Sequence, residues 1–305
     1  MTENNSALKI EKTISLPMTV ESHTVLVDWD NELWIMINSI QNKETFIFKM
    51  NASLSFEKMV SLPLLSTSAT ICKNKLIITG SNFEGKPKII SLNNLGEIQE
   101  EIILELTPTI WPVITCSNKI FFAWQEDADE IKYGSLDLEK NEIDNLPAIS
   151  VNNPPAKLFP LKETIYASFS EKNKTQLVNL INNEISNLDI SQPITVGETI
   201  DAIFYGWLET NSVCLKFLKK DKQINFPMKK ASLGNLKAIS GNEATLWIQK
   251  RELQMDDSYQ WKSTIIQENT EMFEIENFIY AVKSWNDRLV LIQNSRIILL
   301  KKFSI

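Results

Sequence analysis

The sequence contains a single histidine, His23, among 305 residues. A metal site built from several histidines is therefore excluded, and a catalytic triad would have to use His23 itself. We expect His23 to lie on the surface, and we keep it as a candidate for catalysis and for ligand binding. The sequence also has no glycine-rich nucleotide loop and no HExxH helix, which excludes the common nucleotide and zinc-protease sites.

Cysteine is scarce as well, with only Cys72, Cys116 and Cys214. An odd number of cysteines, without a secretion signal, argues against a disulfide framework. Cys72 and Cys116 take the same place in adjacent repeats, and we expect both to be small buried apolar side chains. We also expect a cytoplasmic protein that does not enter a membrane. No apolar run approaches the roughly 18–20 residues of a membrane helix, and the first residues do not resemble a signal peptide.

Positive charge is in short supply, because 31 basic residues face 38 acidic ones and the net charge is -7. A protein that binds nucleic acid neutralises phosphates with a basic surface, so we expect no nucleic-acid partner. Only three of the basic residues are arginines: Arg251, Arg288 and Arg296. Lysine, asparagine and isoleucine are abundant, a bias typical of AT-rich, bacterial-like genomes.

The chain is rich in a repeated pattern, in which a short turn is followed by an alternating apolar strand. The first apolar residue of each copy recurs at intervals of 38 to 45 residues, close to the ~40–50 residues of a four-stranded propeller blade. These residues are Leu33, Leu76, Ile120, Ile165, Ile203, Leu246 and Leu289. Asn or Asp stands two residues earlier in five copies, which suits the left-handed backbone of a tight hairpin.

Each repeat divides into four short strands, which in the first repeat are expected at 24–29, 33–37, 45–50 and 55–62. Only 16 residues follow Leu289, too few for a complete set of later strands. The segment 8–16 near the N-terminus closely resembles the fourth strand 54–62. We therefore predict that the N-terminal strand completes the last sheet and removes its exposed edge.

This pattern resembles the seven-bladed β-propellers, over almost the whole chain. It lacks the Gly-His pairs of WD repeats, the paired glycines of kelch repeats and the Asp-boxes of sialidases. The resemblance implies an all-β fold of four-stranded antiparallel blades in one domain, residues 1–305, closed by the N-terminal strand. It also implies that first strands line a central channel, and that the four-to-one and two-to-three loops form an entrance face. The blades are expected at 22–63, 64–107, 108–149, 150–191, 192–233, 234–268, and 269–305 with 7–17.

Several acidic residues are candidates for chemistry at the mouth of the channel. Glu126 and Asp127 open an acidic turn between two strands, and Glu271 lies in a later loop. Closely spaced carboxylates can bind Ca²⁺, but this turn has no glycine for a sharp calcium loop. We expect its charges to be solvated, and we predict neither a metal nor a cofactor.

Aromatic and arginine side chains are the stronger candidates for binding. Trp111 stands where an entrance loop leads into a first strand, and could stack on a ligand. Arg251 and Arg296 fall in or beside two-to-three turns of neighbouring repeats, which suits bidentate binding of a carboxylate or phosphate. Gln249 and Gln293, near the ends of two second strands, either assist them or satisfy backbone groups.

These features rank three functions. The first is a non-catalytic binding or scaffold protein that holds a peptide, protein or small ligand on its entrance face. The second is an enzyme of lyase, hydrolase or cyclase type, with a carboxylate-based site at the channel mouth. The third is a lectin that stacks sugars on tryptophans, although no polar and aromatic set recurs across the repeats. The oligomeric state stays open.

Overall fold

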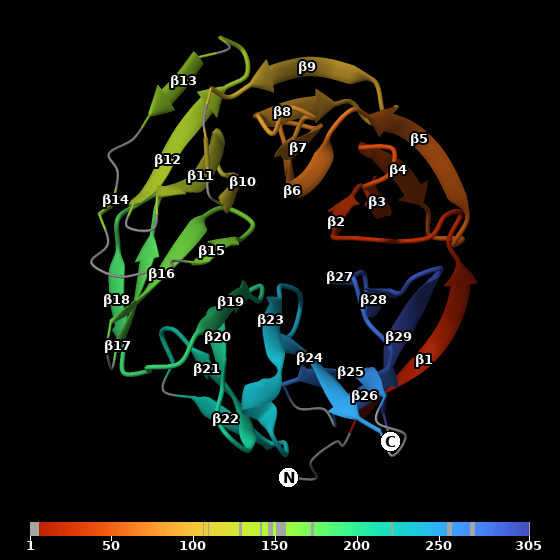
Figure 1. Cartoon of the computed structure of the whole chain (residues 1–305), viewed down its shortest axis with the longest axis vertical. Coiled ribbons are helices and arrows are strands. Elements are labelled where there is room, and N and C mark those ends of the chain that lie inside the picture. Colours follow the sequence, from red (N-terminus) through yellow and green to blue (C-terminus); the bar gives the residue numbers. More distant parts are fainter. Residues whose placement is uncertain are drawn as a thin grey trace. The chain divides into compact units, whose positions relative to one another are not determined.

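The protein is built almost entirely of β-strands (Figure 1). A computed structural model describes residues 6–105, 107–108, 110–127, 130–140, 142–145, 149–150, 157–171, 174–220, 222–254, 258–268 and 272–304. Within these ranges the only helical element is a three-residue 3-10 turn, η1 (Ala231–Leu233), so no helix there could cross a bilayer. The chain divides into two compact units, residues 21–191 and residues 192–305 joined by 1–20.

The unit of residues 21–191 contains four antiparallel sheets in sequence order. The first is β2 (Thr24–Trp29), β3 (Glu32–Ser39), β4 (Glu44–Met50) and β5 (Phe56–Leu62). The second is β6 (Leu65–Cys72), β7 (Lys75–Ser81), β8 (Pro87–Leu92) and β9 (Ile98–Ile103). The third is β10 (Ile110–Cys116), β11 (Ile120–Asp127), β12 (Glu130–Asp137) and β13 (Glu142–Asn145), with β14 (Ile149–Ser150) also paired to β12. The fourth is β15 (Lys157–Pro160), β16 (Ile165–Glu171), β17 (Lys174–Asn179) and β18 (Ile185–Leu188).

The other unit contains the remaining three sheets. The fifth is β19 (Ile194–Glu198), β20 (Ile203–Leu208), β21 (Ser212–Phe217) and β22 (Gln223–Pro227). The sixth is β23 (Asn235–Ile239), β24 (Thr245–Leu253), β25 (Tyr259–Gln267) and β26 (Phe273–Glu276). The seventh is β27 (Ala281–Trp285), β28 (Arg288–Ile292), β29 (Arg296–Ser304) and β1 (Ser6–Ser15).

The repeat pattern in the sequence corresponds to these sheets. All seven marker residues, from Leu33 to Leu289, lie in the second strand of a sheet. The predicted left-handed turn residues have positive φ at Asn31 and Asn74, and in the last sheet at Asn286. The prediction of seven four-stranded antiparallel sheets is confirmed.

Apolar side chains from consecutive sheets pack together and form the core of each unit. One cluster joins the first and second sheets through residues such as Trp34 and Ile78, which are almost fully buried. Another joins the sixth and seventh sheets and includes Trp247, Leu291 and Leu8 of β1. Second strands such as β3 are buried on both faces, because they pack against a sheet on each side.

The N-terminal strand completes the last sheet, as predicted. β1 pairs antiparallel with β29, from Ser6 opposite Ser304 to Ser15 opposite Arg296, with one bulge between Ile10 and Lys12. It supplies the fourth strand that the C-terminal residues lack, and β29 is therefore not an open edge.

An ion pair holds β1 to the second strand of this sheet. Arg288 donates from Nε and Nη2 to the two carboxylate oxygens of Glu11, at 2.5 and 3.0 Å. The hydrogen bond from Arg288 lowers the pKa of Glu11 below its usual value of 4.5. The pair therefore stabilises the fold above the ordinary pKa of glutamate, and its contribution is lost as the pH falls through the lower folded-state pKa.

We predict that Glu11→Gln lowers the free energy of unfolding at pH 7 by less than about 1 kcal/mol, because the pair is solvent-accessible. Urea unfolding at pH 7 and at pH 3 measures this difference. At pH 3 the two proteins should be closer in stability. A difference that grows on acidification would contradict the assigned role of the pair.

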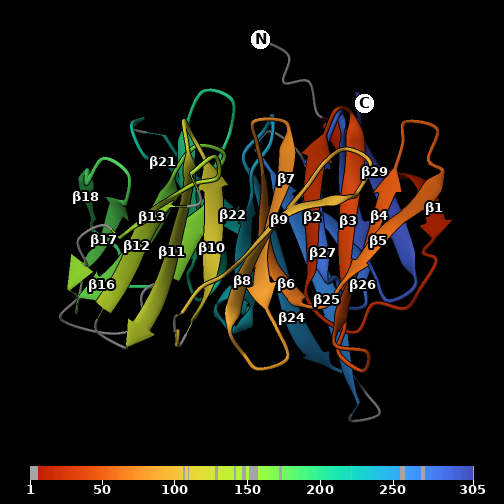
Figure 2. The same ribbon diagram turned by 90° about the horizontal axis from the view of Figure 1, so that it is seen from above.

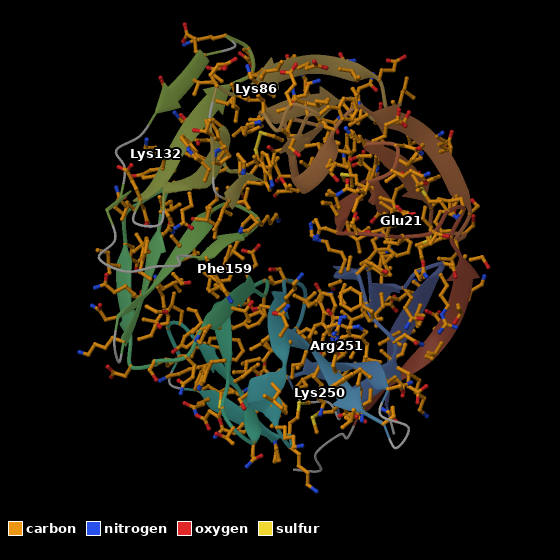
Figure 3. The ribbon with its side chains drawn as sticks, viewed as in Figure 1. Glu21, Lys86, Lys132, Phe159, Lys250 and Arg251 are labelled. Atoms are coloured by element: carbon orange, nitrogen blue, oxygen red, sulfur yellow. A yellow bond between two sulfur atoms is a disulfide. The ribbon has the colours of Figure 1, made fainter. Side chains whose placement is uncertain are left out.

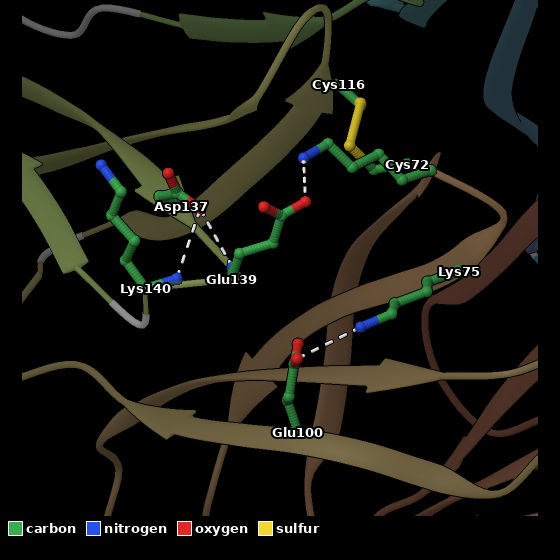
Figure 4. Close-up of polar contacts among 8 residues, drawn as sticks. Cys72, Lys75, Glu100, Cys116, Asp137, Glu139 and Lys140 are labelled. Carbon is green, nitrogen blue, oxygen red and sulfur yellow. Dashed lines mark hydrogen bonds and ion pairs between the residues drawn. A yellow bond between two sulfur atoms is a disulfide. The ribbon is translucent and has the colours of Figure 1, made fainter.

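The expectation for the cysteines was wrong. Cys72 and Cys116 form a disulfide, with their Cα atoms 5.4 Å apart (Figure 4). Each is the last residue of a first strand, β6 or β10, and these strands belong to consecutive sheets. Lys73 and Glu139 form an ion pair of 2.9 Å between the same two sheets. Equivalent positions of neighbouring repeats thus meet across a sheet boundary.

The late repeats also differ from expectation in their boundaries. The sixth sheet ends with β26 (Phe273–Glu276), beyond the expected limit at 268. The segment from Trp261 to Ile266, which looks like a fourth strand in the sequence, belongs to the third strand β25. The reason is the β24–β25 hairpin, whose two nine-residue strands take up the extra length.

Candidate functional site

A cleft of about 460 Å³ opens within the unit of residues 192–305, between the sixth and seventh sheets. Three segments line it: the start of β25, the β26–β27 connection, and the turn between β28 and β29. The lining residues are Tyr259, Gln260, Trp261, Asn277, Phe278, Tyr280, Gln293, Asn294, Ser295 and Arg296. In the terms of the sequence analysis, these are two-to-three turns and a four-to-one connection.

The β24–β25 hairpin forms one wall because its strands are longer than those of the next sheet. β24 has nine residues, whereas β28 has five, and the hairpin projects past its neighbours (Figure 2). In the β24–β25 register Arg251 pairs with Trp261 and Leu253 with Tyr259, so these four side chains share one face. Leu253 is 59% exposed and Tyr259 is 67% exposed. The projecting end of the hairpin therefore presents apolar and aromatic surface to solvent.

Arg251 and the aromatic residues form a continuous row on this wall. The guanidinium of Arg251 lies 4.7 Å from the centre of the Trp261 ring, a cation–π contact (Figure 3 labels Arg251). Trp261 meets Phe278 edge to face at 4.9 Å, and Phe278 meets Tyr280 in the same way at 5.0 Å. Rings packed in this way are held in fixed orientations.

The β26–β27 connection presents Phe278 and Tyr280 for a local reason. Asn277 has a φ of 81°, a conformation that asparagine tolerates, and its N–H donates to the carbonyl of Trp261 at 2.8 Å. Ile279 is fully buried, and its carbonyl accepts a hydrogen bond of 2.9 Å from the side chain of Gln249. Because Ile279 points into the core, its two neighbours are directed towards the cleft.

The turn between β28 and β29 forms the other wall. Gln293 is 3% exposed and donates from Nε2 to the carbonyl of Glu276 at 3.0 Å. Its Oε1 accepts a hydrogen bond of 2.5 Å from Nε of the exposed Arg296. The segment after β1 braces the same turn, since the N–H groups of Leu16 and Val20 donate to the carbonyls of Ser295 and Asn294. The N-terminal closure therefore also supports this wall.

The structure separates the residues proposed for binding into two groups. Arg296 and Gln293 line the cleft, Arg251 stacks on a lining ring, and Gln249 supports the connection behind it. The other two candidates, Trp111 and His23, belong to the unit of residues 21–191 and lie in different sheets of it.

Trp111 and His23 are both exposed within that unit. Trp111 is 37% exposed and lies at a break in the β10–β11 register, between Ile110 and Val113. His23 precedes β2, and its carbonyl accepts a hydrogen bond of 3.1 Å from Asn38. Each is thus available at the surface, but the structure shows no built cavity around either among the residues it describes.

The carboxylates proposed for catalysis lie at the limit of what the structure describes. Glu271 and the side chains of Glu126 and Asp127 fall outside the described residues. Within those residues, no group of three or more His, Cys, Asp or Glu side chains could share a metal ion.

Several carboxyl groups elsewhere have a pKa below its ordinary value. They are Glu11, Asp137, Glu209, Glu252 and Asp287. The main cause is a backbone hydrogen bond for Asp137 and a side-chain hydrogen bond for each of the others. A general acid at neutral pH needs a raised pKa, so none of these five is suited to that role.

The comparison with known proteins identifies the fold and no family. No family model matches the chain, and no curated protein matches it. Among solved structures, BBS1N in complex with ARL6DN is 12% identical, with 97% of each chain covered and a TM-score of 0.59. The WD40 repeats of RRP9 are 11% identical, covering 97% of this chain and 98% of that one, with a TM-score of 0.56. A member of the DUF4221 family from Bacteroides vulgatus is 9% identical, with full coverage of both chains and a TM-score of 0.52.

Seven four-stranded antiparallel sheets, and these neighbours over nearly the full length, decide the fold class. The chain has a seven-bladed β-propeller fold. Each sheet is one blade, and the last blade is completed by β1. At these levels of identity the likeness extends to the fold alone, so the function has to be argued from the cleft.

The sequence analysis missed the aromatic wall, formed by Trp261, Phe278 and Tyr280. Two signals in the sequence could have revealed it. Tyr259 and Trp261 alternate on one face of a strand, and Phe278 and Tyr280 alternate in the following connection. The assignment of the Trp261 segment to a fourth strand placed this tryptophan at a blade's outer edge and concealed the pattern.

Proposed function

We propose that this propeller is a non-catalytic binding protein that holds a peptide segment of a partner in the cleft between its sixth and seventh blades. The observation that carries this proposal is the row of Arg251, Trp261, Phe278 and Tyr280, with Arg296 on the opposite wall. Tryptophan, tyrosine and arginine are the residues that dominate binding energy at protein interfaces. The exposed Leu253 and Tyr259 extend this surface beyond the cleft.

The cleft fits peptide binding better than the two alternatives. Its described lining contains no carboxyl side chain that could serve as a general acid or base, which an enzyme site would need. One face of the Trp261 ring is covered by the guanidinium of Arg251, and that is a face on which a sugar would stack. The aromatic edges and the exposed hairpin remain accessible to an extended chain.

Two further expectations stay predictions. The net charge of -7 favours a protein or peptide partner over nucleic acid. A cytoplasmic location is at odds with the Cys72–Cys116 disulfide, because disulfides persist mainly in oxidising compartments. A thiol count on acid-quenched cells would show in which state the pair exists where the protein is made.

Selection from a phage-displayed library of random 12-residue peptides tests the proposal. Peptides enriched on the wild-type chain should bind Trp261→Ala about 30-fold more weakly, the loss expected at an interface hot spot. Trp111→Ala removes the other exposed tryptophan considered for binding and serves as the matched control, with unchanged affinity expected. Phe278→Ala is the second variant, and thermal unfolding shows that each variant is folded.

Two outcomes would overturn the proposal. One is that no peptide is enriched above the background of an unrelated propeller. The other is that the enriched peptides bind Trp261→Ala and Phe278→Ala as tightly as they bind the wild type.

A further inference from the structure

We infer that the cleft recognises an acidic peptide segment, and that Arg296 binds its carboxylate through both terminal nitrogens while the aromatic wall holds a neighbouring apolar side chain. This inference rests on the proposed function and specifies the chemistry of the partner. It is argued from the charge state of the three arginines, from the orientation of Arg296 and from the distribution of carboxylates around the cleft.

The three arginines of the chain differ in how their charge is neutralised. Arg288 is paired with Glu11 and lies 3.4 Å from Asp287, so its charge is satisfied within the seventh blade. Arg251 and Arg296 have no carboxylate within ion-pair distance among the residues that the structure describes. The two arginines without a described acidic partner are therefore the two at the cleft.

Arg296 is held in an orientation that suits a carboxylate. Gln293 is buried and fixed by its bond to the carbonyl of Glu276, and it accepts the Nε–H of Arg296. Among the described residues, the two Nη groups of Arg296 have no hydrogen-bond acceptor. A guanidinium anchored through Nε presents its Nη pair as a fork, which matches the two oxygens of a carboxylate. Gln293 is thus a positioning residue for this contact.

The acidic residues of the hairpin lie on the other side of the blade. Glu252 pairs with Lys250 at 2.8 Å, and Glu274 pairs with Lys262 at 2.6 Å. Strand alternation places Lys250 and Lys262 opposite to Arg251 and Trp261, which they precede or follow by one residue. The cleft face thus carries positive charge in a chain with an overall charge of -7, and it attracts an acidic segment.

The experiment measures binding of one library-selected peptide by fluorescence polarisation. Replacing each Asp or Glu of the peptide by Asn or Gln, and separately amidating its C-terminus, shows which carboxylate is bound. One of these changes should weaken binding to the wild type about tenfold or more, the size of a lost charge-assisted pair. Arg296→Gln should weaken binding of the acidic peptide equally, and should leave the affinity for the neutralised peptide unchanged.

Two further variants separate positioning from charge. Gln293→Leu keeps Arg296 but removes its anchor, and should weaken the acidic peptide without affecting the neutralised one. Lys262→Gln is the matched control, because it removes one positive charge from the same hairpin on the opposite face. It should leave both affinities within about twofold.

A charge exchange gives the most specific result. Arg296→Glu should reject the acidic peptide and bind the same peptide with Lys at the critical position. If every neutralised peptide binds wild type and Arg296→Gln alike, the inference of an acidic partner is wrong, while binding that still depends on Trp261 leaves the proposed function standing. If binding depends on neither Arg296 nor Trp261, both are wrong.

Discussion

Deleting residues 1–17 is expected to abolish the cooperative folding of the unit that contains residues 192–305. The deletion removes β1, which buries Leu8 and pairs along nearly the whole of β29. It also removes the hydrogen bond from Leu16 to the turn beside the cleft. We expect a loss of about 5 kcal/mol or more, which is comparable with the total stability of many domains. The exposed edge of β29 would also promote aggregation.

Thermal unfolding followed by circular dichroism, together with the soluble yield, measures this effect. The control is a circular permutant that begins at residue 18 and carries residues 1–17 after residue 305 through a short flexible linker. It contains the same residues and can form the same β1–β29 pairing, so it should regain a cooperative transition. A truncated chain that unfolds like the full chain would contradict the role of β1. A single calorimetric transition for the full chain would support the prediction of one domain.

Removing the disulfide is expected to have the second largest effect on stability. The bond closes a loop with a sequence separation of 44, for which the chain-entropy model gives about 4 kcal/mol, and observed values are typically about 2–4 kcal/mol. Cys116→Ser should therefore lower the midpoint of urea unfolding. Reduction should destabilise the wild type but leave the unfolding of Cys116→Ser unchanged.

Cys214 provides the control for this experiment. It is buried and has no disulfide partner among the described residues, and burial raises its pKa to about 11. A thiol assay on the unreduced, denatured protein should count one thiol per chain, and three after reduction. Three thiols before reduction would show that the bond does not form.

Much of the fold could be predicted from the sequence because the repeat is carried by local signals. Leu33, Asn31 and their equivalents mark a hairpin whose geometry depends on a few adjacent residues. The missing fourth strand at the C-terminus and the matching segment at residues 8–16 predicted the closure by counting alone. The disulfide was missed for the opposite reason. Cys72 and Cys116 were weighed by their number and the absence of a signal sequence, rather than by the contact between equivalent positions of consecutive blades.

The site was only partly predictable. Arg251 and Arg296 drew attention because arginine is rare in this chain, and both lie at the cleft. The orientation of Arg296 depends on a bond from Gln293 to the carbonyl of Glu276, 17 residues away, which no local pattern reveals. Phe278 is directed into the cleft because Ile279 is buried in the blade core. Such tertiary constraints decide which residues of a loop become available for binding.

Hydrogen–deuterium exchange of the full chain, with and without a library-selected acidic peptide, tests the central claim most directly. The account predicts slower exchange on binding in residues 258–268, 272–280 and 293–296, the segments that line the cleft. Exchange in residues 21–191, including the strand that carries Trp111, should be unchanged. Slower exchange confined to residues 21–191 would contradict the account and place binding on the other unit.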